Sequence, residues 1–151
     1  MKLRQITGTL AMGLILFAST ADAAILTTAA HDFHAASFAD QGKVGYGISG
    51  VANTGTSSLS IIGAVKRNPS SAIDGSQTVT VEGYNPSGVT SSGVVWAFNN
   101  VVLTSKLYSA SASGAWSKTV TFTAAEAPTT VYYDVQVFLG VNAVLAGAYV
   151  N

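Results

Sequence analysis

The sequence predicts a single antiparallel β-sandwich of about eight strands, with Greek-key or jelly-roll-like connections, behind a cleaved signal peptide. From residue 43 onward, short β-rich runs alternate with clusters of Gly, Pro, Asn and Ser, which is typical of all-β sandwiches. No stretch after Gly42 has the length and period of a three-turn helix. The chain has no cysteine, so its 48% of hydrophobic residues must form the core without disulfides.

The first 23 residues have the pattern of an export signal. Lys2 and Arg4 provide the positive start, residues 10–18 the apolar middle, and Ala21-Asp22-Ala23 the small-residue exit. The apolar middle is far shorter than the about 20 residues that a membrane-spanning helix needs. We therefore expect cleavage before Ala24, export to the periplasm or the cell exterior, and no transmembrane segment in the mature chain.

The mature chain is expected to hold one domain, residues 43–151, preceded by an N-terminal arm. Residues 24–42 are rich in alanine and show neither strand alternation nor a helical stripe. The following 109 residues show no shift in composition and no repeat of 20 to 50 residues, which excludes a solenoid or propeller.

The first three predicted strands are separated by strong turn signals. Residues 44–51 come first and end at the turn Asn53-Thr54-Gly55. Residues 59–66 follow, and Asp74-Gly75 predicts the next turn. Residues 78–84 then alternate cleanly between valine and polar side chains, as a strand with one buried face does.

The later strands begin with a predicted hairpin. Residues 93–98 and 101–108 flank Asn99-Asn100, which we read as a two-residue loop. Residues 117–123 place Val120 and Phe122 inward, and residues 143–150 close the chain.

Residues 130–139 alternate most regularly of all. One face carries Val131, Tyr133, Val135, Val137 and Leu139, and we expect it to point into the core. The other face carries Tyr132, Asp134, Gln136 and Phe138.

Charge argues against several classes of partner. The chain after residue 23 keeps five basic and six acidic side chains, and Lys66-Arg67 is its only pair of adjacent bases. Nucleic-acid binding needs a clustered basic face, and attraction to anionic membranes needs a polybasic segment. We expect neither kind of partner.

The only cluster of imidazole and carboxylate lies in the predicted arm. His31 and His34 are three residues apart, so they could share one face of a helical turn and bind zinc, with Asp32 or Asp40 as a further ligand. A zinc site needs three or four protein ligands, and the chain has no third histidine and no cysteine. We expect no metal and no other cofactor.

Catalytic motifs are equally sparse. The sequence lacks the G-x-S-x-G pattern of serine hydrolases. A glycosidase needs two carboxylates that face each other, for which Glu82, Glu126 and Asp134 are the candidates. Because isolated carboxylates on solvated strand faces are far commoner, we expect a protein without enzymatic activity.

The aromatic residues suggest a binding surface. Planar rings beside carboxylate and amide groups suit sugar rings, since an apolar plate and orienting hydrogen bonds occur together. The expected ligand-binding residues are Trp96, Trp116, Tyr132, Asp134 and Gln136. The competing interpretation is that these aromatics cover the core, or that the strand is buried on both faces.

These observations favour an exported binding module for a surface or matrix glycan. The alternative is a self-associating structural protein of an envelope, filament or matrix, because residues 143–150 are apolar and uncharged. Such a strand, left at an exposed edge, would pair with another chain.

Several segments resemble a loose group of short exported bacterial proteins of unknown function. The segments are Asn53-Thr54-Gly55, LSIIGAVKRN, TVTVEGYN, SKLYSASASG and VYYDVQVFLG, which span most of residues 50–140. The resemblance implies a secreted β-sandwich and carries over no functional residue.

Overall fold

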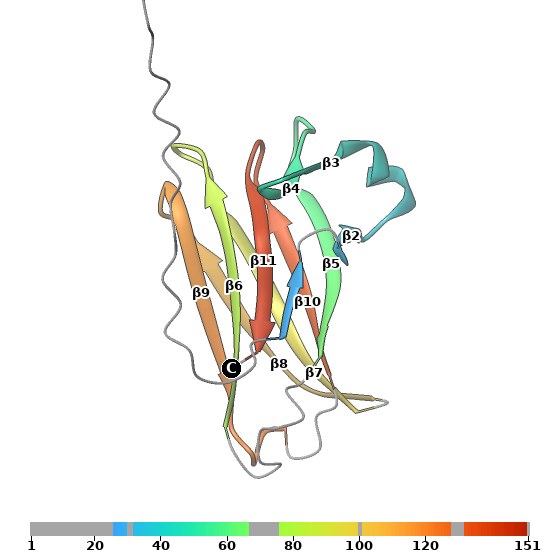
Figure 1. Ribbon diagram of the computed structural model, residues 1–151, viewed down its shortest axis with the longest axis vertical. Coiled ribbons are helices and arrows are strands. Elements are labelled where there is room, and N and C mark those ends of the chain that lie inside the picture. The colour runs from blue at the N-terminus through green and yellow to red at the C-terminus, as the bar shows by residue number, and fades with distance from the viewer. Residues whose placement is uncertain (1–25, 30–31, 67–75, 100, 128–131, 151) are drawn as a thin grey trace, which may run out of the picture.

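Two antiparallel β-sheets packed face to face form the protein (Figure 1). The computed structural model describes residues 26–29, 32–66, 76–99, 101–127 and 132–150. The β-sandwich predicted from the sequence is therefore confirmed. The longest helical segment of these residues is η2, a 3-10 helix over Phe38–Lys43, and the described chain includes no helix long and apolar enough to cross a membrane.

The two sheets are called sheet A and sheet B. Sheet A has the order β3 (Val44–Gly47), β4 (Gly50–Asn53), β11 (Val144–Val150), β6 (Gln77–Asn85) and β9 (Gly114–Phe122), and β1 (Leu26–Ala29) also pairs with β11. Sheet B has the order β2 (His34–Ala35), β5 (Leu59–Lys66), β10 (Tyr132–Leu139), β7 (Ser91–Asn99) and β8 (Val101–Ala110).

The connections between the eight strands β4 to β11 follow the jelly-roll pattern. Sheet A takes them in the order β4-β11-β6-β9, and sheet B in the order β5-β10-β7-β8. Every connection except the β7–β8 hairpin crosses from one sheet to the other. Of the two topologies that the sequence left open, the structure has the jelly roll, which consists of two Greek keys.

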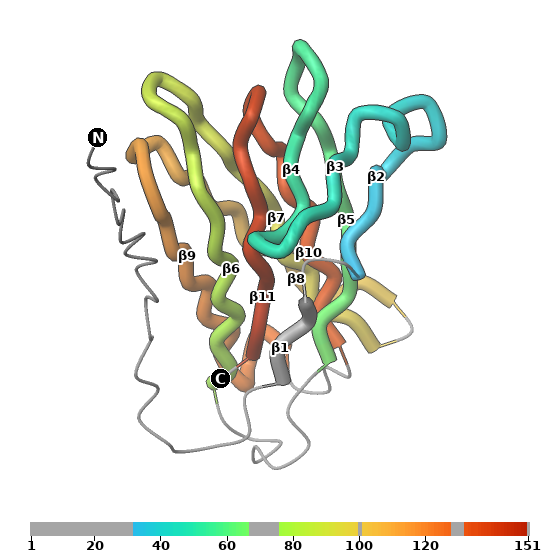
Figure 2. Tube along the Cα trace, turned by 45° about the horizontal axis from the view of Figure 1, so that its top comes forward, coloured from blue at the N-terminus to red at the C-terminus, as the bar shows by residue number. Residues whose placement is uncertain are grey.

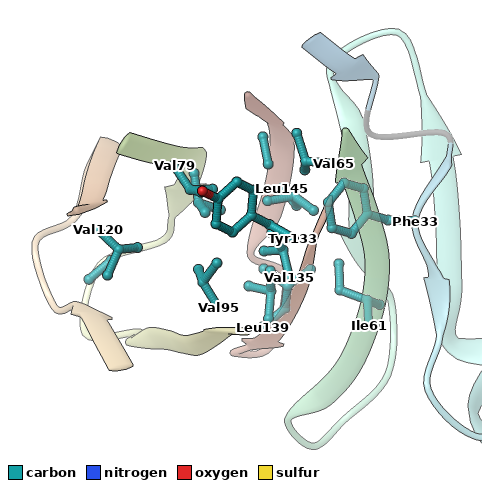
Figure 3. Packing of buried hydrophobic residues seen from close by; sticks show 14 of the residues in the cluster. Phe33, Ile61, Val65, Val79, Val95, Val120, Tyr133, Val135, Leu139 and Leu145 are labelled. Carbon is teal, nitrogen blue, oxygen red and sulfur yellow. The ribbon is translucent and has the colours of Figure 1, made fainter. Parts of the chain in front are cut away.

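The core lies between the sheets and is made by alternate residues of each strand. Figure 3 shows Tyr133, Val135 and Leu139 of β10 pointing into the same space as side chains of sheet A such as Val79 and Leu145. All five are essentially without solvent exposure. The inward face predicted for residues 132–139 is therefore confirmed, as is the inward face of Val120 and Phe122.

The predicted strand over residues 44–51 was wrong in one respect, because it is a hairpin. β3 and β4 pair with each other, and the exposed Ile48 lies in the turn between them. Gly50 has a φ of 131°, which L-residues rarely adopt. A side chain there would also run into the backbone oxygen of Leu145. The turn thus depends on a glycine inside a run that reads as continuous strand.

The segment before β3, which we expected to be an arm, takes part in both sheets. β1 pairs with β11 in sheet A, and β2 pairs with β5 at the edge of sheet B (Figure 2). Phe33 is fully buried, and its ring lies over Gly63 of β5. A side chain in this segment therefore closes one side of the core.

The final strand is paired on both sides. β6 runs along one side of β11, while β4 and β1 follow each other along the other side. β11 is therefore an interior strand of sheet A and not an open edge.

Several sequence predictions concern positions outside the described residues. These are the signal peptide over residues 1–23, His31, Val131, the Asp74-Gly75 turn and Asn100 of the β7–β8 loop.

Replacing Gly63 tests how tightly Phe33 closes the core. The nearest ring atom of Phe33 lies 2.7 Å from the position that a Cβ at residue 63 would take. We expect Gly63→Val to lower the free energy of unfolding by about 1–3 kcal/mol through overpacking. Urea denaturation followed by circular dichroism measures this loss.

Gly47→Val is the matched control, since a Cβ at Gly47 meets nothing within 4 Å. We expect it to change stability by less than about 0.5 kcal/mol. Equal stability of the two variants would show that Phe33 is not packed on Gly63.

Candidate ligand-binding face

The outer surface of sheet B gathers most of the residues that the sequence singled out. We call this surface the binding face; its central residues are Tyr132, Asp134, Gln136 and Phe138 of β10 and Ser92, Val94, Trp96 and Phe98 of β7. The antiparallel register places Asp134 beside Trp96, and Tyr132 beside Phe98. Because the side chains of a strand alternate, these residues point away from the core that their neighbours fill. Trp96, Tyr132, Asp134 and Gln136 thus lie together on this face and are partly exposed.

Trp116 does not join them, and its placement on the predicted site was wrong. It belongs to β9 in sheet A, is 6% exposed and packs in the core. Its indole occupies the space over Gly83, its cross-strand partner, where a side chain would run into the ring. The alternation contained the signal, since Trp116 has the same parity as the inward Val120 and Phe122.

Two parallel rings form one end of the binding face. The centroids of Phe98 and Tyr132 are 5.3 Å apart, with an angle of 1° between the ring planes. Trp96 lies one row further along β7, about 7 Å from Phe98 at the spacing of alternate strand residues. Sequence reasoning missed Phe98, although it follows Trp96 at the same two-residue period.

Asp134 lies at the centre of the face, and its carboxylate has no neutralising partner among the residues that the structure describes. Partial burial among its neighbours raises the pKa of this carboxyl above its usual value. In the described part of the chain, no cation or hydrogen-bond donor reaches its oxygens. The carboxylate is therefore a free hydrogen-bond acceptor between aromatic side chains.

Gln136 is held in place by a neighbour on β5. Its Nε2 donates a hydrogen bond to Oγ of Ser60 at 2.6 Å. This bond orients the amide and leaves its oxygen to accept a further hydrogen bond.

A shallow hollow forms the other end of the face. It measures about 470 Å³ and is lined by Ser92, Gly93, Leu107, Tyr108, Ser109 and Phe138. The side chains of Leu107 and Phe138 are 82% and 39% exposed. The hollow therefore offers apolar walls and two serine hydroxyls to solvent.

The three carboxylates considered for glycosidase chemistry lie apart. Glu82 is on the outer face of sheet A, where it accepts a hydrogen bond from the Tyr149 hydroxyl at 3.2 Å. Asp134 is on the opposite side of the sandwich. Glu126 pairs with Lys106 at 2.8 Å and also accepts a hydrogen bond from the backbone of Thr123.

The histidine cluster is only partly described. His34 is exposed on β2. Across the residues that the structure covers, no three His, Cys, Asp or Glu side chains come close enough together to hold a metal ion.

Comparison of this chain with protein-family models, with curated proteins and with solved structures finds no match.

The raised pKa of Asp134 predicts a pH-dependent stability. Because the folded protein holds this proton to a higher pH than the unfolded chain, the contribution of Asp134 is fully present in acid and is lost as the pH rises through the folded pKa. We expect Asp134→Asn to raise the melting temperature at pH 7 and to leave it unchanged near pH 3.

Glu126→Gln is the control of opposite sign. Its bonds to Lys106 and Thr123 lower the pKa of Glu126 from 4.5 to about 2. Its contribution is present at neutral pH and is lost as the pH falls through that range. We expect Glu126→Gln to lower the melting temperature at pH 7 and to have less effect toward pH 2. A destabilised Asp134→Asn variant at pH 7 would contradict the assignment of an uncompensated carboxylate.

Proposed function

We propose that the binding face holds a glycan, and that the protein is an exported, non-enzymatic binding module for a surface or matrix glycan. The observation that carries this proposal is the arrangement at the centre of sheet B. Parallel rings of Phe98 and Tyr132 lie beside Trp96, with the unpaired carboxylate of Asp134 among them.

The rings match the apolar side of a sugar. A pyranose presents C–H groups on its ring faces and hydroxyls around its rim. An aromatic side chain takes the C–H face, as apolar and aromatic linings do in small-molecule sites generally. Phe98 and Tyr132 stack on each other, so Trp96, one row further along β7, is the ring that takes the face of a sugar.

The polar groups match the rim. An ionised carboxylate accepts two or more hydrogen bonds, and bonds to a charged acceptor are about twice as strong as neutral ones. Asp134 is partly desolvated and has no partner among the described residues, so sugar hydroxyls would restore the hydrogen bonds that it lost from water. The fixed amide of Gln136 adds an acceptor one row away.

Other partners fit the face less well. A nucleic acid brings phosphates, which the Asp134 carboxylate repels. Among the described cross-strand partners of the central residues of the binding face, the one base is Lys66, at the margin beside Tyr132. Self-association through the last strand was the alternative function. It depended on an open edge at β11, and β11 is paired along both sides.

Export completes the proposal. A signal peptide over residues 1–23 delivers the domain to the compartment where surface and matrix glycans occur. A fold that needs no disulfide suits that compartment whether it is oxidising or not.

The two tryptophans provide a matched test. We expect Trp96→Ala to weaken glycan binding at least about tenfold, or 1.4 kcal/mol, because it removes a stacking ring. We expect its melting temperature to stay close to that of the unmodified protein, since Trp96 is outside the core. Affinity for the tightest ligand on a glycan array, together with thermal melting, measures both effects.

Trp116→Phe should show the reverse. Loss of core volume should lower stability by about 1–3 kcal/mol, while glycan affinity stays within about twofold. Equal loss of binding in both variants would place the ligand elsewhere, and absence of any binding by the unmodified protein across the array would overturn the proposed function.

A further inference from the structure

We infer that the ligand is an extended, uncharged oligosaccharide that lies along β10 and β7, from the rings at Tyr132 to the hollow at Phe138. This inference rests on the proposed function and adds the length, direction and charge class of the ligand.

The length follows from the spacing of the two ends. Tyr132 and Phe138 are six residues apart on one strand, which corresponds to about 20 Å. One sugar ring covers a single row of side chains. Both ends are therefore used together only by a chain of several sugars.

The direction follows from where the large side chains lie. On the outer face, β10 and β7 contribute the aromatic rings of Trp96, Phe98, Tyr132 and Phe138. The neighbouring positions of β5 are Ser60, Ile62, Ala64 and Lys66, and those of β8 include Ser105, Leu107 and Ser109. Because outward aromatic rings occur at both ends of the two central strands and not at these positions of β5 and β8, a sugar chain is best held parallel to the strands.

The hollow supplies the far subsite. Phe138 and Leu107 give apolar contact, and Ser92 and Ser109 give hydroxyls that both donate and accept hydrogen bonds. This combination of apolar walls and neutral hydroxyls matches another sugar unit. These lining residues carry no charge, so they provide no counter-ion for a charged sugar.

The charge class of the ligand follows from the other outward residues of β10 and β7. Asp134 is the only ionisable side chain among the central residues of β10 and β7 other than the phenol of Tyr132. A uronic acid or sulfated sugar would bring an anion to this carboxylate. The described bases on the outer face of sheet B lie at its margin: Lys66 is opposite Tyr132, and His34 is on β2, opposite Ile62 of β5. Neutral sugars bring only hydroxyls, which the carboxylate accepts.

The experiment measures affinity against chain length. The probes are cello-oligosaccharides and chito-oligosaccharides of one to six units, which are uncharged and extended, and oligogalacturonates as acidic counterparts. Titration calorimetry on the unmodified protein should show affinity that rises with length and then levels off. Oligogalacturonates of equal length should bind at least tenfold more weakly.

Variants at the two ends separate the parts of the inference. Phe138→Ala should weaken a hexamer about tenfold and leave a dimer unchanged, because the dimer occupies the end at Trp96. Trp96→Ala should weaken both. Tyr84→Ala, an exposed aromatic on sheet A, is the control and should change neither.

Each outcome bears on a different claim. If Trp96→Ala weakens binding and Phe138→Ala has no effect at any length, the ligand does not extend along β10 to Phe138, while the glycan site at Trp96 stands. Tighter binding of oligogalacturonates would overturn the charge class. If neither series binds and the array also gives no ligand, the proposed function itself fails.

Discussion

Strand β10 lies in the middle of sheet B, between β5 and β7, and its side chains alternate between the core and the binding face. Tyr133, Val135 and Val137 fill the space between the sheets, so their neighbours must point outward. A slip of one residue would exchange the two sets completely. Two buried hydrogen bonds fix the register: Asn53 donates to the backbone oxygen of Leu139 at 3.0 Å, and the Tyr133 hydroxyl donates to Gln77 of β6 at 2.7 Å. The proposed glycan site is thus positioned by core packing.

Glycines opposite aromatic rings complete the core in a chain that has no disulfide. Three glycines on inward positions leave space that a ring from another segment fills: Phe33 lies over Gly63, Trp116 over Gly83, and Tyr108 over Gly93. The three rings come from the segment before β2 and from the edge strands β9 and β8. They therefore close the sandwich along its sides, where the sheets have no further strands. Two of these rings bury a polar atom in this packing. The Tyr108 hydroxyl and the Trp116 indole nitrogen are buried and have no hydrogen-bond partner among the described residues.

Local alternation allowed most of the fold to be predicted, and long-range complementarity explains the rest. The inward residues of β6, β9 and β10 follow from their two-residue period, and so do Tyr132, Asp134 and Gln136 on the opposite face. The β3–β4 hairpin was missed because Gly50 is needed for a turn that only the approach of β11 makes visible. Trp116 was assigned to the surface because the sequence does not show that Gly83 lies opposite it and leaves space for the indole. Pairing of β1 and β2 could not be foreseen, since four- and two-residue strands are too short to show a period.

Trp116 belongs to the core, and we propose that Trp96 belongs to a ligand-binding surface. Two-dimensional NMR resolves the indole N–H signals of the chain's two tryptophans, and titration with cellohexaose or chitohexaose tests the claim directly. We expect the Trp96 signal to shift progressively with added ligand while the Trp116 signal stays in place. A shift of Trp116 with Trp96 unmoved would contradict it, because the ligand would then contact sheet A and not the face built on β10.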